Sequence, residues 1–335
     1  MLDLKNPAIN FAIQTTRAAV QLVQQVQSEL VTPALTKEDR SPVTVADYAC
    51  QALVAHLLSE SFPETPLVAE ESSSALKKQG AEKNLALVTG FVQRALGSKA
   101  PQALGPEQVC EWIDRGQTDR ASRFWTLDPI DGTKGFLRGD QYAVALALVQ
   151  DGVVQIGVLG CPNLVDAATP DLAGPGTLVI AARGQGSWYS PLDTQTGWTQ
   201  LHVSTRSKPA EAHLLRSFES GHTNVDQIGL FARAMGIQAD PVLMDSQAKY
   251  AVLAAGKGDL LLRLLSSSQQ DYREKIWDQA AGSLVLEEAG GRITDLDGKP
   301  LDFSTGRSLV HNRGVLASNG MLHAPALAAL KQIGA

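Results

Sequence analysis

One short stretch constrains the fold of this chain more than any other. An apolar run, Phe124-Trp125-Thr126-Leu127, ends on Asp128. Aromatic and apolar residues of this kind favour a buried strand, and Pro129 forces the chain to turn because it cannot donate to a ladder. Asp131 and Gly132 follow, and Gly132 lets the backbone approach a ligand closely. The sequence therefore predicts a strand that presents two carboxylates where it ends.

The two aspartates predict a metal and phosphate site. Asp128 and Asp131 offer hard oxygen atoms, the donors that Mg²⁺ prefers. The residues from Thr133 onward can open a helix, whose first N–H groups favour a phosphate. An ordinary Asx turn is the alternative for a bare pair of aspartates. The preceding strand and the fixed places of Pro129, Gly132 and Thr133 favour the ligand site.

The order of predicted elements changes near residue 204. Before it, helices precede consecutive antiparallel strands, an α+β pattern; after it, strands and helices alternate, an α/β pattern. We expect helices at 7–30, 47–60, 86–96 and 106–114 and strands at 67–69, 124–127, 142–149, 153–159, 178–182, 187–189 and 199–203. After residue 204 we expect strands at 213–217, 241–244 and 259–264 and helices at 224–235, 247–255 and 278–289. Two domains, 1–203 and 204–335, should face each other across a ligand cleft, and the polar stretch 72–85 should be a mobile surface loop.

Composition excludes several classes of protein. Of the 335 residues, 44% are hydrophobic and 19% charged, which excludes a disordered chain, and the net charge of −6 excludes a broad basic surface for nucleic-acid polymers. No apolar run approaches the roughly 20 residues of a membrane helix, and the first residues do not resemble a secretory signal. We therefore expect a cytoplasmic protein, in which Cys50, Cys110 and Cys161 are buried thiols.

Three more acidic positions are candidates for the same site. Glu70 and Glu71 lie at the end of the predicted strand 67–69, Asp47 lies near the start of one predicted helix, and Asp278 lies at the start of another. Each has a simpler interpretation. Adjacent glutamates are typical of a solvated strand end, and a lone aspartate often stabilises a helix N-terminus. The residues alone leave both interpretations open.

Taken together, the acidic blocks resemble the inositol monophosphatase superfamily of Mg²⁺-dependent, lithium-sensitive phosphatases. The blocks that carry the resemblance are Glu70-Glu71-Ser72, Asp128-Pro129-Ile130-Asp131-Gly132-Thr133, Trp277 to Gly282 and Glu288 to Gly291. Further blocks are similar to one branch, the 3′(2′),5′-bisphosphate nucleotidases: Ser41 to Asp47, Lys134 to Gly139, Gly160 to Leu164, Gly221-His222, Asp245 to Tyr250 and Glu274 to Asp278. The resemblance implies a layered α-β-α-β-α sandwich of the inositol monophosphatase and fructose-1,6-bisphosphatase type.

The resemblance also implies roles for single residues. Glu70 and Asp128, with the Ile130 carbonyl, would hold one Mg²⁺; Asp128, Asp131 and Asp278 would hold a second, and a third is expected near Glu70. Asp47 with Thr133 would orient and deprotonate the attacking water. The substrate-binding residues would be Gly132, Thr133, His222, Ser246, Lys249 and Arg263. For Lys249 and Arg263 a solvated surface position is the alternative, and for His222 an ordinary loop position.

The implied activity is hydrolysis of adenosine 3′,5′-bisphosphate to AMP and phosphate by a monomer, with 3′-phosphoadenylyl sulfate and inositol 1,4-bisphosphate as further candidate substrates. One alternative is a phosphatase of inositol monophosphate or inositol polyphosphates. Another is a non-catalytic sensor of phosphonucleotides, which would be expected to have lost some metal ligands. The acids at 70, 128, 131 and 278 are all present, which favours an enzyme.

Overall fold

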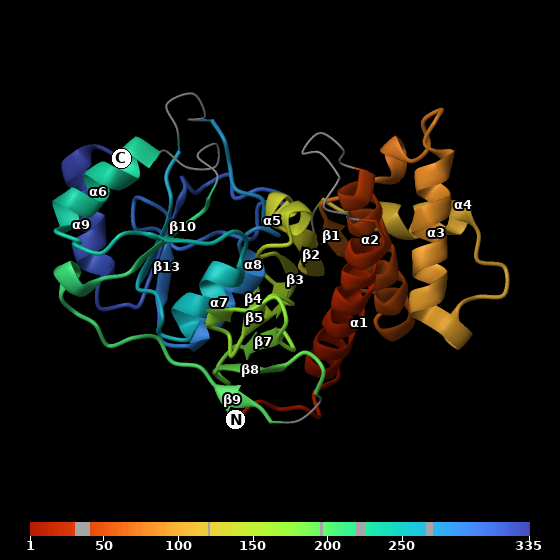
Figure 1. Cartoon of the computed structure of the whole chain (residues 1–335), viewed down its shortest axis with the longest axis horizontal. Coiled ribbons are helices and arrows are strands. Elements are labelled where there is room, and N and C mark those ends of the chain that lie inside the picture. The colour runs from red at the N-terminus through yellow and green to blue at the C-terminus, as the bar shows by residue number, and fades with distance from the viewer. Residues whose placement is uncertain (31–40, 120, 195–196, 219–224, 266–270) are drawn as a thin grey trace.

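The computed structural model describes residues 1–30, 41–119, 121–194, 197–218, 225–265 and 271–335. Two mixed β-sheets and the helices around them make up the fold (Figure 1). In the described part of the chain, no helix has the length and apolar character needed to cross a membrane.

The first sheet is formed by residues of the first 200 positions. It has seven strands in the order β1-β2-β3-β4-β7-β8-β9, and all neighbours are antiparallel except β1 and β2. The strands are β1 (Leu67–Ala69), β2 (Arg123–Asp131), β3 (Ala143–Gln150), β4 (Val153–Cys161), β7 (Thr177–Ala182), β8 (Ser187–Pro191) and β9 (Thr199–Gln200). A separate small ribbon pairs β5 (Leu164–Val165) with β6 (Thr169–Pro170).

Both faces of the central strands of this sheet are buried. Along β3, Val144, Leu146 and Leu148 belong to a cluster shared with the N-terminal helices, whereas Ala143 and Ala145 belong to a second cluster shared with α7 and α8. Side chains alternate between the faces of a strand, so one strand supplies both cores. The N-terminal helices are α1 (Pro7–Leu30), α2 (Ser41–Ser61), α3 (Glu82–Leu96) and α4 (Pro106–Asp114).

The second sheet lies beyond α7 (Ala248–Ala254) and α8 (Ala280–Glu288), which Figure 1 shows between the two sheets. Its order is β11-β10-β12-β14-β13, with β11, β10 and β12 parallel. The strands are β10 (Leu214–Arg216), β11 (Val242–Leu243), β12 (Leu260–Arg263), β13 (Arg292–Thr294) and β14 (Val315–Ser318). A third cluster packs its outer face against α6 (Val225–Met235) and α9 (His323–Ile333). The predicted α-β-α-β-α layering is confirmed.

Most predicted elements are present. In the predicted hairpin of β3 and β4, Asp151 and Gly152 have φ angles of 50° and 75°, the left-handed values that such a turn requires. The structure adds β13, β14 and α9, which the sequence analysis did not identify. The three cysteines are buried free thiols, as predicted.

Two predictions about local structure are wrong. Helix α2 begins at Ser41, six residues before the predicted start, so Asp47 lies inside the helix. The stretch 72–85 is not simply a surface loop, because it contains a 3₁₀ turn and the first turn of α3. Ser73 is buried and donates two hydrogen bonds to the Asp114 carboxylate, at 2.8 Å from its amide and 2.6 Å from its hydroxyl. These bonds tie the segment to α4.

Helix α8 approaches the first sheet closely enough to require a glycine. A Cβ atom at Gly157 in β4 would lie 2.6 Å from the Ala281 carbonyl oxygen of α8. Because that oxygen belongs to backbone, relief would require the helix to move away from the sheet.

We expect Gly157→Ala to lower the free energy of unfolding by about 1–3 kcal/mol, measured by urea denaturation. Gly90→Ala is the matched control, because a Cβ at Gly90 in α3 would meet its nearest atom at 3.7 Å. Alanine is the better helix former, so the control should be unchanged or more stable by up to about 1 kcal/mol. Equal stability of Gly157→Ala and the wild type would contradict the packing argument.

Candidate active site

Parallel pairing of β1 with β2 brings two of the predicted acids together. Ala69 lies opposite Leu127 in the register, so Glu70 and Asp128 follow these residues at the same edge of the sheet. The charge of Glu70 raises the pKa of Asp128, so the two carboxyl groups lie within electrostatic reach of each other. β1 ends just before Glu70, whereas β2 runs beyond the predicted strand 124–127 and past Asp128 to Asp131. The strand pairing makes the two acids neighbours.

A register shift in β2 brings Asp131 to the same face as Asp128. Asp128 pairs with Ala145 and Asp131 pairs with Ala143, so three steps on β2 match two steps on β3. Such a bulge is the expected response to Pro129, which cannot donate to the ladder. Paired residues of antiparallel strands point to the same face, and Ala143 and Ala145 both face α7 and α8. Without the shift, strict alternation would place the two aspartates on opposite faces.

The segment before α7 completes this face. The backbone amide of Gln247 donates to the Asp131 carboxylate at 2.6 Å. Its buried side-chain amide donates to the Trp277 carbonyl at 3.0 Å and accepts from the Gly282 amide at 3.1 Å. Gln247, which lies 116 residues after Asp131, thus fixes the segment that carries Asp278 relative to Asp131.

The simpler interpretations of Asp47 and Asp278 are not supported. Asp47 is a buried residue in the interior of α2 rather than at its N-terminus. Helix α8 begins at Ala280 with Gln279 as its N-cap, and no side chain caps it. Neither aspartate is therefore explained by helix capping.

The predicted acids change one another's titration. Burial is the largest cause of a raised pKa at Asp47, Asp128, Asp131 and Asp278. Glu70 is exposed as a residue, but the surrounding protein desolvates its carboxyl group and raises its pKa to about 7. At Asp47, Glu70, Asp128 and Asp278 the second cause is repulsion from neighbouring carboxylates, whereas at Asp131 the neighbouring groups lower the pKa. The pKa of Asp128 is raised by Glu70, Asp131, Asp278 and Asp47 in that order. The five carboxylates therefore lie close enough to resist carrying full charge together.

Oxygen donors with excess buried charge match the chemistry of a hard divalent cation. Within the ranges that the structure describes, however, no three His, Cys, Asp or Glu side chains form a group that could hold a metal ion. Glu70 is also exposed, unlike Asp47 and Asp128. The donor set thus fits Mg²⁺ in its chemistry, and ion binding would require these side chains to adjust.

Thr133 and the predicted carbonyl ligand Ile130 are neighbours. The Thr133 hydroxyl donates to the Ile130 carbonyl at 3.5 Å, and Thr133 is exposed at the start of α5 (Thr133–Arg138). Its expected pairing with Asp47 stays a prediction. Gly132 has a φ of 90°, and a Cβ there would lie 2.9 Å from the Cβ of Ser246. The segment before α7 therefore approaches Gly132 closely, and the approach to a ligand stays a prediction.

The predicted nucleotide-binding residues differ in their surroundings. Lys249 is buried, and its ammonium donates to the Ser246 carbonyl at 2.7 Å. Burial lowers the pKa of Lys249 to about 8, although Asp131 and Asp245 raise it. Arg263, on β12, is ion-paired with Glu274 at 3.0 Å. His222 lies outside the described residues. A solvated surface position, the alternative for Lys249, is excluded by its burial.

Two further residues join the segments of the site, and the sequence analysis gave neither a role. Gln247 lies within the block Asp245 to Tyr250, which is similar to the nucleotidase branch, and only the residues around it in that block indicated a role. Arg307 has no local signal, because it follows a glycine in a polar loop. Its guanidinium lies over the Trp277 ring, 4.7 Å from the centroid, and donates to the Gly116 carbonyl at 2.9 Å. Its charge also lowers the pKa of Glu70.

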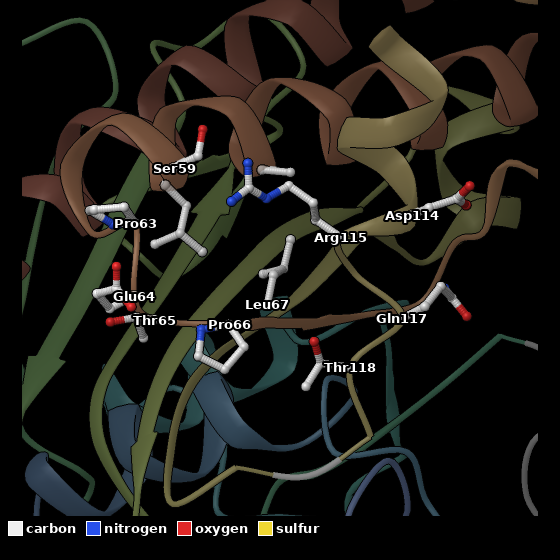
Figure 2. Close-up of a pocket in the computed structure, with 12 residues that line it drawn as sticks. Ser59, Pro63, Glu64, Thr65, Pro66, Leu67, Asp114, Arg115, Gln117 and Thr118 are labelled. Carbon is white, nitrogen blue, oxygen red and sulfur yellow. The ribbon is translucent and has the colours of Figure 1, made fainter. Parts of the chain in front are cut away.

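A separate cavity lies at the other end of β1. Its volume is about 590 Å³, and Figure 2 shows Arg115 extending across it toward Ser59 of α2. None of the predicted metal or nucleotide residues lines it. The carboxylate face is thus distinct from this cavity.

The comparison with known families agrees with the fold and the acidic motifs. Residues 4–335 match the Inositol monophosphatase family, so the chain belongs to that family. Its members are generally Mg²⁺-dependent. A solved structure, the Thermotoga maritima IMPase, has a TM-score of 0.63 and 19% identity, with 98% of each chain covered. At that identity the likeness supports the fold alone.

The relatives with higher sequence identity to this chain carry the name of one branch of the family, the 3′(2′),5′-bisphosphate nucleotidases. The 3′(2′),5′-bisphosphate nucleotidase of Schizosaccharomyces pombe is 41% identical, with 92% of this chain and 90% of that protein covered. The 3′(2′),5′-bisphosphate nucleotidase of Oryza sativa is 42% identical, with 91% and 88% covered. The similarity therefore extends over more than 90% of this chain.

The raised carboxyl pKa values predict how stability depends on pH in protein treated with EDTA. A carboxyl group with a raised pKa binds protons more readily in the folded state, so its contribution to stability falls as pH rises through the window above the ordinary value of 3.8. We expect Asp128→Asn to be more stable than the wild type at pH 7.5, by about 1 kcal/mol or more. This advantage should shrink toward pH 5.5.

Urea denaturation at both pH values measures this difference. Burial lowers the pKa of His323 to about 4, so its contribution to the stability of the protein is lost as pH falls. This contribution is the same in variant and wild type, and it cancels in the difference between their free energies of unfolding. Asp297→Asn is the control, because Asp297 forms an exposed pair with Arg313, which contributes little. A wild type more stable than Asp128→Asn at pH 7.5 would contradict the repulsion argument.

Proposed function

We propose that this chain is a Mg²⁺-dependent phosphatase that hydrolyses adenosine 3′,5′-bisphosphate to AMP and phosphate. The observation that carries the proposal is the placement of a buried cation, Lys249, beside the carboxylate Asp131. The acids can hold Mg²⁺ at the phosphate that is cleaved, and the neighbouring lysine can bind a second phosphate. This arrangement suits a substrate with two phosphates. Identity of about 40% to 3′(2′),5′-bisphosphate nucleotidases supports the same activity.

Glu70, Asp128, the Ile130 carbonyl, Asp131 and Asp278 would hold two to three Mg²⁺ ions. Bound Mg²⁺ supplies Lewis-acid stabilisation to the phosphoryl group under attack. Asp47 and Thr133 would orient the attacking water, and Asp47, whose pKa is raised mainly by burial, is suited to accept its proton.

Ser246, Lys249, Arg263 and His222, with Gly132 and Thr133, would bind the nucleotide. Arg263 would have to share its guanidinium between Glu274 and the substrate. 3′-Phosphoadenylyl sulfate and inositol 1,4-bisphosphate are proposed as further substrates. The monomeric state and cytoplasmic location stay predictions.

Steady-state phosphate release tests the activity. We expect turnover of adenosine 3′,5′-bisphosphate to require Mg²⁺, to stop with EDTA and to exceed by far that of inositol monophosphate. Asp131→Asn should lower kcat about 100-fold or more, because metal stabilisation contributes several kcal/mol, while circular dichroism stays unchanged. The control Asp297→Asn should keep full activity. Equal or faster release from inositol monophosphate would refute the nucleotide assignment, and undiminished Asp131→Asn activity would refute the metal assignment.

A second variant tests the lysine separately. Lys249→Met keeps the length and apolar stem but removes the charge. We expect the KM for adenosine 3′,5′-bisphosphate to rise about tenfold or more, the scale of one charged hydrogen bond. Lys208→Met is the matched control, since Lys208 is exposed and pairs with Glu211 on the surface. An unchanged KM in Lys249→Met would exclude Lys249 from substrate binding.

A further inference from the structure

An aromatic ring is exposed where β10 ends, beside the predicted phosphate-binding residues. Phe218 keeps 47% of its surface exposed. The preceding residue, Ser217, has its hydroxyl 3.5 Å from the Lys249 ammonium. The Phe218 backbone amide donates at 3.3 Å to Asp245, the residue before Ser246. Residues 217 and 218 therefore run alongside the segment that carries Ser246 and Lys249.

Polar contacts hold this ring in place. The guanidinium of Arg138, at the end of α5, lies over the Phe218 ring, 5.4 Å from its centroid. Arg138 is itself fixed by ion pairs with Asp245 and, at 2.9 Å, with Asp140. The carboxylate of Asp245 thus binds both the backbone of Phe218 and the cation that covers its ring. Because the ring is already held in place, it loses less side-chain conformational entropy when a ligand binds than an unconstrained surface phenylalanine would.

The elements around the ring connect it to the carboxylate face. Helix α5 follows Asp131 and Gly132, and a Cβ at Gly135 would lie 3.5 Å from the Cβ of Asp245. The Asp131 carboxylate accepts from Gln247, two residues after Asp245. One short segment, residues 245–249, therefore links the acids, the lysine and the ring. A substrate held by Lys249 beside Asp131 would have its nonreacting end within reach of Phe218.

We propose that Phe218 is the specificity-determining residue that stacks on the purine base of the nucleotide. Every base has an apolar π face, and stacking on a fixed aromatic ring favours a nucleotide over a sugar phosphate or inositol phosphate of equal charge. This role rests on the proposed function, because it assigns the base to a substrate whose phosphates meet Lys249 and the acids. The stacking itself requires only that AMP binds.

Two ligands that differ only in the base test the role. AMP and ribose 5-phosphate carry the same sugar and phosphate, and both can be measured by isothermal titration calorimetry. We expect Phe218→Leu, which keeps an apolar side chain but loses the π face, to weaken AMP binding about tenfold while ribose 5-phosphate binding stays within twofold. Phe218→Trp should bind AMP as well as the wild type or more tightly.

Kinetics and a control variant complete the test. With adenosine 3′,5′-bisphosphate, Phe218→Leu should raise KM about tenfold and leave kcat within twofold. Leu230→Ala, which changes a side chain of similar exposure on α6, should alter neither constant. Unchanged thermal denaturation midpoints would confirm that the variants fold.

The outcomes separate this inference from the proposed function. If the wild type does not turn over adenosine 3′,5′-bisphosphate but Phe218→Leu selectively loses AMP binding, the proposed function fails and the stacking role holds. If turnover is normal but Phe218→Leu weakens AMP and ribose 5-phosphate equally, the ring merely supports Arg138, and the stacking role is overturned. Unchanged AMP binding in Phe218→Leu overturns it as well.

Discussion

The repulsion among carboxylates on one face of the first sheet is the constraint on which the rest of the site depends. Parallel pairing of β1 and β2 and the register shift in β2 force Glu70, Asp128 and Asp131 toward each other. Burial then raises the pKa of Asp128 well above its usual range, and its neighbours raise it further. Holding these carboxylates together lowers the stability of the folded state, and strongly shifted pKa values of this kind are typical of functional sites.

Compensation for this repulsion comes from the other half of the chain. The amide of Gln247 and the charges of Lys249 and Arg263 all lower the pKa of Asp131. Each belongs to the layer of α7 and α8 or to the second sheet. The same contacts that balance the acids therefore also bring the proposed nucleotide-binding residues beside them.

The middle layer makes this balance possible because it packs on both sheets. Helices α7 and α8 share one hydrophobic cluster with residues of β3, β4, β12 and β14. Gly157 lets α8 approach the first sheet closely, and Gln247 ties the start of α7 to the start of α8. The two sheets thus share the layer formed by α7 and α8, and the residues just before these two helices lie beside the acids.

Periodicity, turn residues and the acidic blocks by themselves determined most of the elements, the hairpin at Asp151-Gly152 and the presence of acids at strand ends. These features depend on neighbours within a few residues. Tertiary structure alone decided that Asp128 and Asp131 share a face, that Gln247 contacts Asp131 from 116 residues away, and that Arg263 pairs with Glu274. It also decided the start of α2 and the anchoring of the segment after β1. These features depend on pairing register and on contacts between distant segments, and local patterns in a sequence do not encode which distant residue becomes a neighbour.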